Sequence, residues 1–147
     1  MSERETIERA RKDAREGKAP STQAGEFVRE EIEHVREGKH GVRSTKQAIA
    51  IGLSKARRAG VKLPASKGSS ARTRAQATRD LAKGRKPGRK VSAKRSRAMR
   101  DALRDEGHAA ASPGALAKQA RASAKKRSPA QRSAAARKAA RTRARKS

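Results

Sequence analysis

The sequence predicts an all-α protein without a β-sheet, in which a small helical head is followed by a long basic arm. Three observations support this fold class. Helix-start patterns, in which a serine precedes a run of helix formers, recur along the chain. Apolar residues between positions 21 and 60 are spaced for one face of a helix. Alanine, the strongest helix former, occupies 23 of the last 84 positions.

The first predicted helix covers residues 3–16. Ser2 and Glu5 form a capping box, in which each side chain bonds to the backbone N–H of the other residue, and Gly17 ends the helix. Its apolar stripe contains only Ile7 and two alanines. We therefore expect this helix to be exposed to solvent.

The second predicted helix covers residues 22–38. Val28, Ile32 and Val35 are spaced at i, i+4 and i+7, which places them on one face of the helix. This face is expected to be buried. A short basic turn then leads to the next helix.

The third predicted helix covers residues 44–60 and completes a helical hairpin. It begins at another capping box, Ser44 with Gln47, and ends at Gly60, which can adopt the positive φ of a helix C-terminus. A segment of ~40 residues rarely folds alone. We therefore expect the hairpin either to be marginally stable or to be completed by the first helix, a second copy or the nucleic acid. Self-association would use four apolar residues of the hairpin: Val28, Ile32, Ile49 and Leu53.

Beyond Pro64 the chain is predicted to form a basic arm of weakly packed or disordered helical segments. Serines begin these segments, and glycines or prolines separate them. The expected segments are residues 69–83, 92–106, 112–127 and 128–146. The predicted organisation is therefore a charged N-terminal helix (1–20), a helical-hairpin head (21–63) and the arm (64–147).

Charge is distributed very unevenly along the chain. The sequence contains 41 Lys+Arg against 14 Asp+Glu, a formal net charge of +27, and residues 64–147 hold 26 of the bases but only 4 of the acids. From position 107 onward there is no acidic residue. Such a polycation repels itself and binds an external polyanion, so we expect a nucleic acid as the partner.

Composition disfavours catalytic and cofactor chemistry. There is no cysteine, so thiol chemistry and thiolate metal sites are excluded, and the glycine-rich loop of nucleotide hydrolases is absent. His34, His40 and His108 are not spaced with carboxylates as a metal site requires. We expect no metal, no cofactor and no enzymatic activity. No apolar signal segment or membrane span is present, which favours a cytoplasmic protein located in the nucleoid, without a membrane partner.

The candidate nucleic-acid contacts fall into four groups. A helix over the last segment would align Arg137, Arg141 and Arg145 beside a slim row of alanines. The preceding segment, with Lys118, Arg121 and Lys125, repeats this arrangement. The Gly/Pro-containing basic loop at 84–90 has the composition of a minor-groove arm, and the start of the third helix favours an anion. The candidate residues are Lys39, Arg43, Ser44, Lys46, Arg85, Lys86, Arg89, Lys90, Lys118, Arg121, Lys125, Lys126, Arg127, Arg137, Lys138, Arg141 and Arg145.

Residues 25–60, and above all the stretch KQAIAI at positions 46–51, resemble a family of small basic bacterial proteins of unknown function. Residues 96–103 and 132–140 look like the arm of the same family. This resemblance implies no catalytic residues. Separately, the Ala/Lys/Arg arm is similar in composition to linker-histone tails and bacterial histone-like proteins, which implies DNA compaction by analogy.

The hypothesis that follows is largely sequence-independent DNA binding through phosphate neutralisation. Phe27 is the single aromatic residue of the Phe, Trp and Tyr types in the sequence. Single-strand binders stack bases on several such side chains, so this mode of binding is unavailable and duplex DNA is favoured. Two alternatives remain open. The first is an RNA- or ribosome-associated assembly factor. The second is a head that docks a protein partner, with the arm as its nucleic-acid anchor.

Overall fold

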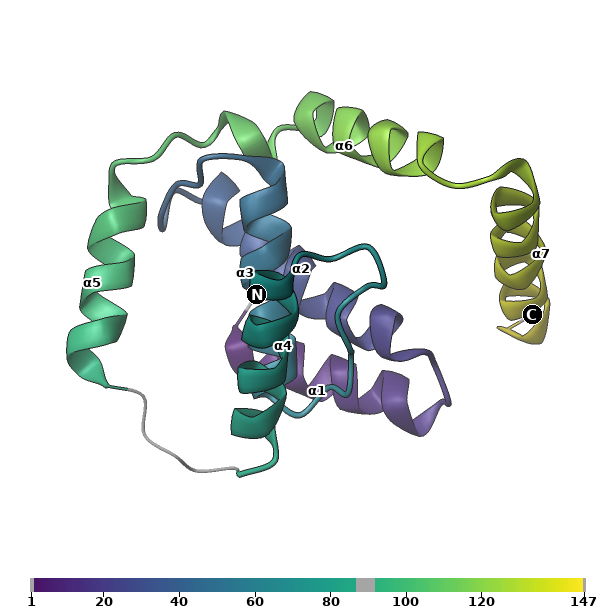
Figure 1. Ribbon diagram of the computed structural model, residues 1–147, viewed down its shortest axis with the longest axis horizontal. Coiled ribbons are helices and arrows are strands. Elements are labelled where there is room, and N and C mark those ends of the chain that lie inside the picture. Colours follow the sequence, from purple (N-terminus) through teal and green to yellow (C-terminus); the bar gives the residue numbers. More distant parts are fainter. Residues whose placement is uncertain (1, 87–91, 147) are drawn as a thin grey trace. The chain divides into compact units, whose positions relative to one another are not determined.

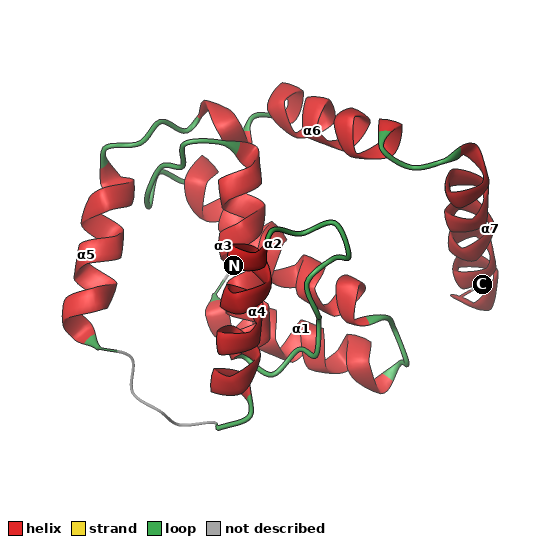
Figure 2. Ribbon diagram, viewed as in Figure 1, coloured by secondary structure: helices red, strands yellow, loops and turns green. Residues whose placement is uncertain are grey.

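The computed structural model describes residues 2–86 and 92–146, and helices are its only regular elements (Figures 1 and 2). No strand occurs in these residues, which confirms the all-α fold class. The chain divides into an N-terminal unit (Met1–Ser112) and a C-terminal unit (Pro113–Ser147). The helices are α1 (Glu3–Arg15), α2 (Pro20–Arg36), α3 (Thr45–Arg58), α4 (Ala71–Gly84), α5 (Ala93–Arg104), the short 3₁₀ helix η1 (Ala109–Ala111), α6 (Pro113–Lys125) and α7 (Pro129–Lys146).

Helix α1 begins at the expected capping box. The backbone N–H of Ser2 donates to Glu5 Oε2 over 2.8 Å, and the Glu5 N–H donates to Ser2 Oγ over 3.3 Å. Hydrogen bonds from the backbone and the hydroxyl of Ser2 hold the pKa of Glu5 below its usual value. This local geometry fixes the start of the helix.

The expectation that α1 is a solvent-exposed helix is wrong. The helix packs against α2 and buries Thr6, Ala10 and Asp13. The small side chain of Ala10 permits this contact, and the buried Thr6 hydroxyl donates to Ser2 O over 3.1 Å. Hydrophobic patterning missed this face because two of its three buried residues are polar.

Lys18 holds the turn between α1 and α2. Its Nζ lies 2.6 Å from Asp13 Oδ1 and 2.9 Å from Glu16 Oε2. Hydrogen bonds to these two carboxylates raise the pKa of Lys18. Gly17 precedes it with φ +73°, which suits a glycine at the end of a helix.

Helices α2 and α3 form the predicted hairpin, and two small apolar clusters lie along it. The first contains Phe27 and Val61 and extends to α1, whereas the second contains Val35, Val42 and Ala111. Alanines from both helices fill much of the remaining core, so the helices approach closely. Gly60 ends α3 with φ +104°, as the sequence predicts.

Most of the apolar surface considered for self-association is used inside the hairpin. Leu53 packs against the first cluster and Ile32 against the second, while Val28 lies against Gly52. Ile49 is half-buried. These contacts account for the apolar spacing without a second copy of the chain.

Replacing Gly52 by alanine is expected to lower the free energy of unfolding by about 1–3 kcal/mol. A Cβ built at Gly52 would lie 2.6 Å from Cα of Val28, so α2 and α3 would have to separate. Gly25 in α2 is the matched control, because nothing lies within 4 Å of its Cβ position. Gly25→Ala should raise the free energy of unfolding by about 0.8–1 kcal/mol through helix propensity. Urea denaturation measures both changes, and stabilisation by Gly52→Ala would contradict the close contact.

The N-terminal unit includes later parts of the chain as well as the hairpin. Two glycines, Gly41 and Gly84, allow the backbone of these later parts to lie close to the hairpin. The Gly41 N–H donates to Leu103 O and the Val42 N–H to Gly107 O, both over 2.9 Å. A Cβ at Gly41 would collide with the backbone of Glu106. Gly84 at the end of α4 likewise lies against the carbonyl of Arg57.

The structure therefore differs from the sequence-based division at residue 63. Helix α4 packs against α3 and buries Ala77 and Asp80, and η1 contacts both α2 and α3. Weak packing thus does not describe the first part of the arm. It does describe the C-terminal unit, since neither α6 nor α7 contains a buried residue.

Candidate nucleic-acid interface

Helix α7 concentrates positive charge with nothing to balance it. Ser128 and Gln131 begin the helix with a capping box, because the Ser128 N–H donates to Gln131 Oε1 over 2.9 Å and the Gln131 N–H donates to Ser128 Oγ over 3.2 Å. All 18 residues of the helix are exposed. Seven of them are basic and none is acidic: Arg132, Arg137, Lys138, Arg141, Arg143, Arg145 and Lys146.

The bases of α7 flank a slim face. Successive residues of an α-helix are separated by ~100°, which places Ala136, Ala140 and Ala144 on one face. Arg132 and Arg143 lie on one side of this face. On its other side lie Arg137 and Arg141, followed around the helix by Arg145 and Lys138. The helix therefore presents a narrow alanine strip between two lines of guanidinium groups.

Helix α6 carries a single basic stripe. Lys118, Arg121 and Lys125 are spaced at i, i+3 and i+7, so they share one face, and all three are exposed. Lys126 and Arg127 continue the positive charge after the helix ends and are also exposed. All five predicted contacts in this segment are therefore exposed to solvent.

The start of α3 differs from the open anion site expected there. Lys39 Nζ lies 3.4 Å from Glu37 Oε2, and Arg43 Nε lies 3.7 Å from Glu106 Oε1. Ser44 caps the helix by accepting from the Gln47 N–H over 3.1 Å, and Lys46 is exposed. Two of the four predicted contacts therefore already have a carboxylate partner, which weakens the attraction for a phosphate.

The other predicted contacts follow α4. Arg85 and Lys86 are exposed there, whereas Arg89 and Lys90 lie outside the described residues. The proposed minor-groove loop is therefore described only at its first end.

Helix α5 is a basic surface that the sequence analysis did not single out. It buries only Leu103, and its five bases are all exposed. The pattern that could have identified it is the density of bases in a short helix with almost no apolar residues. The five are Lys94, Arg95, Arg97, Arg100 and Arg104.

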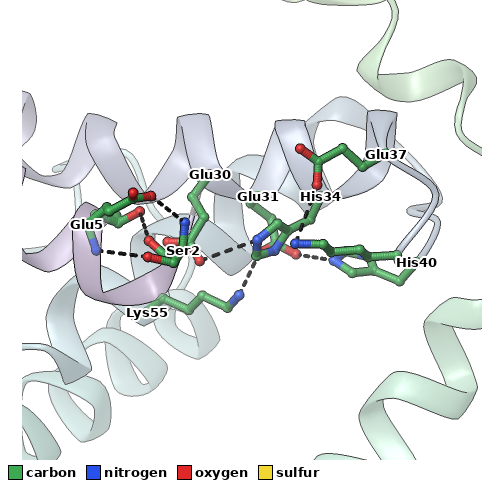
Figure 3. A network of polar contacts seen from close by, with 10 residues as sticks. Ser2, Glu5, Glu30, Glu31, His34, Glu37, His40 and Lys55 are labelled. Atoms are coloured by element: carbon green, nitrogen blue, oxygen red, sulfur yellow. Dashed lines mark hydrogen bonds and ion pairs between the residues drawn. The ribbon is translucent and has the colours of Figure 1, made fainter.

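The N-terminal unit also contains a cluster of buried carboxylates and partly buried histidines (Figure 3). His40 Nε2 lies 2.7 Å from Glu31 Oε1, and Lys55 Nζ lies 2.7 Å from Glu31 Oε2. His34 Nε2 lies 3.5 Å from Glu30 Oε1. The expectation that the histidines have no suitably placed carboxylates is therefore wrong for His34 and His40. The i, i+4 spacing of Glu30 and His34 on a helix could have revealed the second of these pairs.

Membrane insertion is not indicated for any helix in residues 2–86 and 92–146, since none combines the length and the apolar character that a span requires.

Comparison with known proteins finds a protein-family model that matches the N-terminal part of the chain. Residues 2–67 match the model of a family of unknown function, DUF6496. The matched range covers α1 to α3 and ends before α4. Neither a curated protein nor a solved structure matches the chain. The match supports the resemblance to an uncharacterised family and does not reach the basic C-terminal unit.

Proposed function

We propose that the chain is a non-enzymatic protein that binds duplex DNA largely independently of sequence, by neutralising phosphates. The proposal is based on the unbalanced positive charge and the exposure of the helices of the C-terminal unit. Its two helices bury no residue, and residues 113–147 contain 12 of the 41 Lys+Arg and none of the 14 Asp+Glu. A segment with no core of its own and no internal counter-charge depends on an external polyanion.

Helix energetics support the same conclusion. Like charges at i, i+4, such as Arg137 with Arg141, oppose helix formation in water. Isolated helices of this length are marginal even with favourable composition. Phosphates placed along the arginines would remove this repulsion. Binding should therefore increase the helix content of α6 and α7.

The shape of α7 fits the major groove. The 18 residues span ~27 Å, and a helix of about 10–12 Å diameter enters a groove that is ~12 Å wide. With Ala140 facing the groove floor, Arg143 points toward one phosphate backbone and Arg141 toward the other. Alanine offers no donor to base edges, so contact of this kind carries little sequence information.

The absence of aromatic surface favours a duplex over a single strand. The one phenylalanine, Phe27, is 3% exposed and lies in the first core cluster. Stacking on unpaired bases is therefore not available to it. By this proposal the protein is associated with the nucleoid and resembles histone-like proteins in how its arm works, with the N-terminal unit orienting the arm.

The test is competition between a duplex DNA and a structured RNA of equal length for the intact chain, at low and at physiological salt. We expect the DNA to compete at least as well as the RNA at both salt concentrations. A clear preference for the RNA would instead assign the protein to RNA or ribosome assembly, where basic arms thread between helices.

A further inference from the structure

Glu31, His34 and His40 meet where the α2–α3 hairpin turns. Glu31 and His34 are separated by one helical turn on α2, and the chain reverses at Gly38, which has φ +79° and brings His40 back to them. The three residues each offer a ligand atom, and these atoms lie within 4.8 Å of one another. Glu31 is fully buried, while the side chains of His34 and His40 are 15% and 11% exposed, which leaves a route from solvent.

The ring of His40 is oriented between a carbonyl oxygen and Glu31. The His40 Nδ1 lies 3.0 Å from the carbonyl oxygen of Gly41, which can only accept, so Nδ1 donates to it. The other ring nitrogen, Nε2, lies 2.7 Å from Glu31 Oε1. These two atoms can share either a proton or a metal ion, and titration with a metal distinguishes the two.

An unsatisfied oxygen atom lies on the neighbouring residue. Glu30 Oε2 is buried and accepts no hydrogen bond from the described residues. A buried carboxylate oxygen without a partner is costly. Lys55 balances only Oε2 of Glu31, at 2.7 Å.

We propose that Glu31, His34 and His40 bind one divalent transition-metal ion, with Zn²⁺ as the best-suited ion. Two imidazole nitrogens and one carboxylate are a ligand set that Zn²⁺ uses, with water in the fourth position. The bond from His40 Nδ1 to a backbone carbonyl, and the carboxylate of Glu30 beside His34, match the outer-shell partners that orient metal-binding histidines. The proposal of this site does not depend on the proposed function.

Lys55 makes the proposal sharply testable. Its ammonium group neutralises Glu31 in the metal-free protein and repels a divalent ion at the neighbouring oxygen. Lys55→Met should therefore increase Zn²⁺ affinity by about tenfold, since close like charges oppose binding. If the cluster is only an ion-pair network, the same substitution leaves Zn²⁺ affinity unchanged or lower.

The experiment is calorimetric titration of the untagged, full-length chain with Zn²⁺ at neutral pH, with the absorption of bound Co²⁺ as a second readout. We expect one ion per chain. Removal of an outer-shell partner lowers metal affinity by about 10–100-fold. We expect His34→Gln and His40→Gln each to lower Zn²⁺ affinity by more than this. The matched control is His108→Gln, because His108 is exposed and lies outside the cluster. It should bind as the unmodified chain does.

Circular dichroism of each metal-free variant shows whether the fold is retained, and Lys55→Met provides a result that does not depend on the histidine variants. Zn²⁺ affinity that is unchanged in the His34→Gln/His40→Gln double variant would overturn the proposal, as would the absence of any one-to-one binding. Duplex DNA affinity, measured in parallel with and without Zn²⁺, is expected to be the same. Failure of the metal site is therefore distinguishable from failure of the proposed function.

Discussion

Replacement of all seven lysines and arginines of α7 by glutamine is expected to lower the affinity for duplex DNA by on the order of 10³-fold at physiological salt. Each phosphate contact releases condensed counterions, and α7 offers seven exposed bases without a competing carboxylate. Loss of seven contacts would also make the log–log dependence of affinity on salt shallower by up to about six. Fluorescence anisotropy on a labelled duplex measures both quantities.

The control for this variant removes the same charge from the N-terminal unit. Seven exposed bases are replaced there by glutamine, which also lowers the formal net charge from +27 by seven. They are Arg4, Arg11, Lys62, Lys67, Arg72, Arg79 and Lys83. We expect this control to lose far less affinity than the α7 variant. Equal losses would show that overall net charge, rather than α7, determines binding.

The alanine face of α7 gives a second large effect. Ala136→Glu combined with Ala140→Glu should weaken duplex binding by about 100-fold, because like charges juxtaposed across an interface cost several kcal/mol. In the proposed orientation these two positions face the groove between the phosphate backbones. The carboxylates would be held close to both strands.

The matched control places the same two charges on the far side of the helix. Ala134→Glu combined with Ala135→Glu, which lie about 120–140° around the helix from Ala140, has the same composition, the same net charge and the same loss of helix propensity. We expect only a few-fold loss of affinity, from the change in net charge. Equal effects of the two pairs in the same anisotropy assay would exclude a preferred face of α7.

Structural features that depend on residues close together in the sequence were predictable. The capping boxes of Ser2 and Ser128, the positive φ of Gly60 and the all-α class depend on local spacing and on backbone preferences. The exposure of α7 was equally predictable. A helix of alanine and arginine has no large apolar residue to bury.

Features set by distant contacts were not predictable. The packing of α4 and of residues 103–111 depends on how closely the backbone can approach at Gly41 and Gly84, and spacing along the chain does not reveal this. Arg43 lies beside Glu106, 63 positions away. For the same reason His40 could not be assigned to Glu31 until the turn at Gly38 was known.

The most direct test of phosphate neutralisation is the affinity of the intact chain for one duplex at several salt concentrations, with helix content followed by circular dichroism. Ten phosphate contacts predict a log–log slope of about −9, together with an increase in helicity on binding. A shallow slope without an increase in helicity would contradict the account.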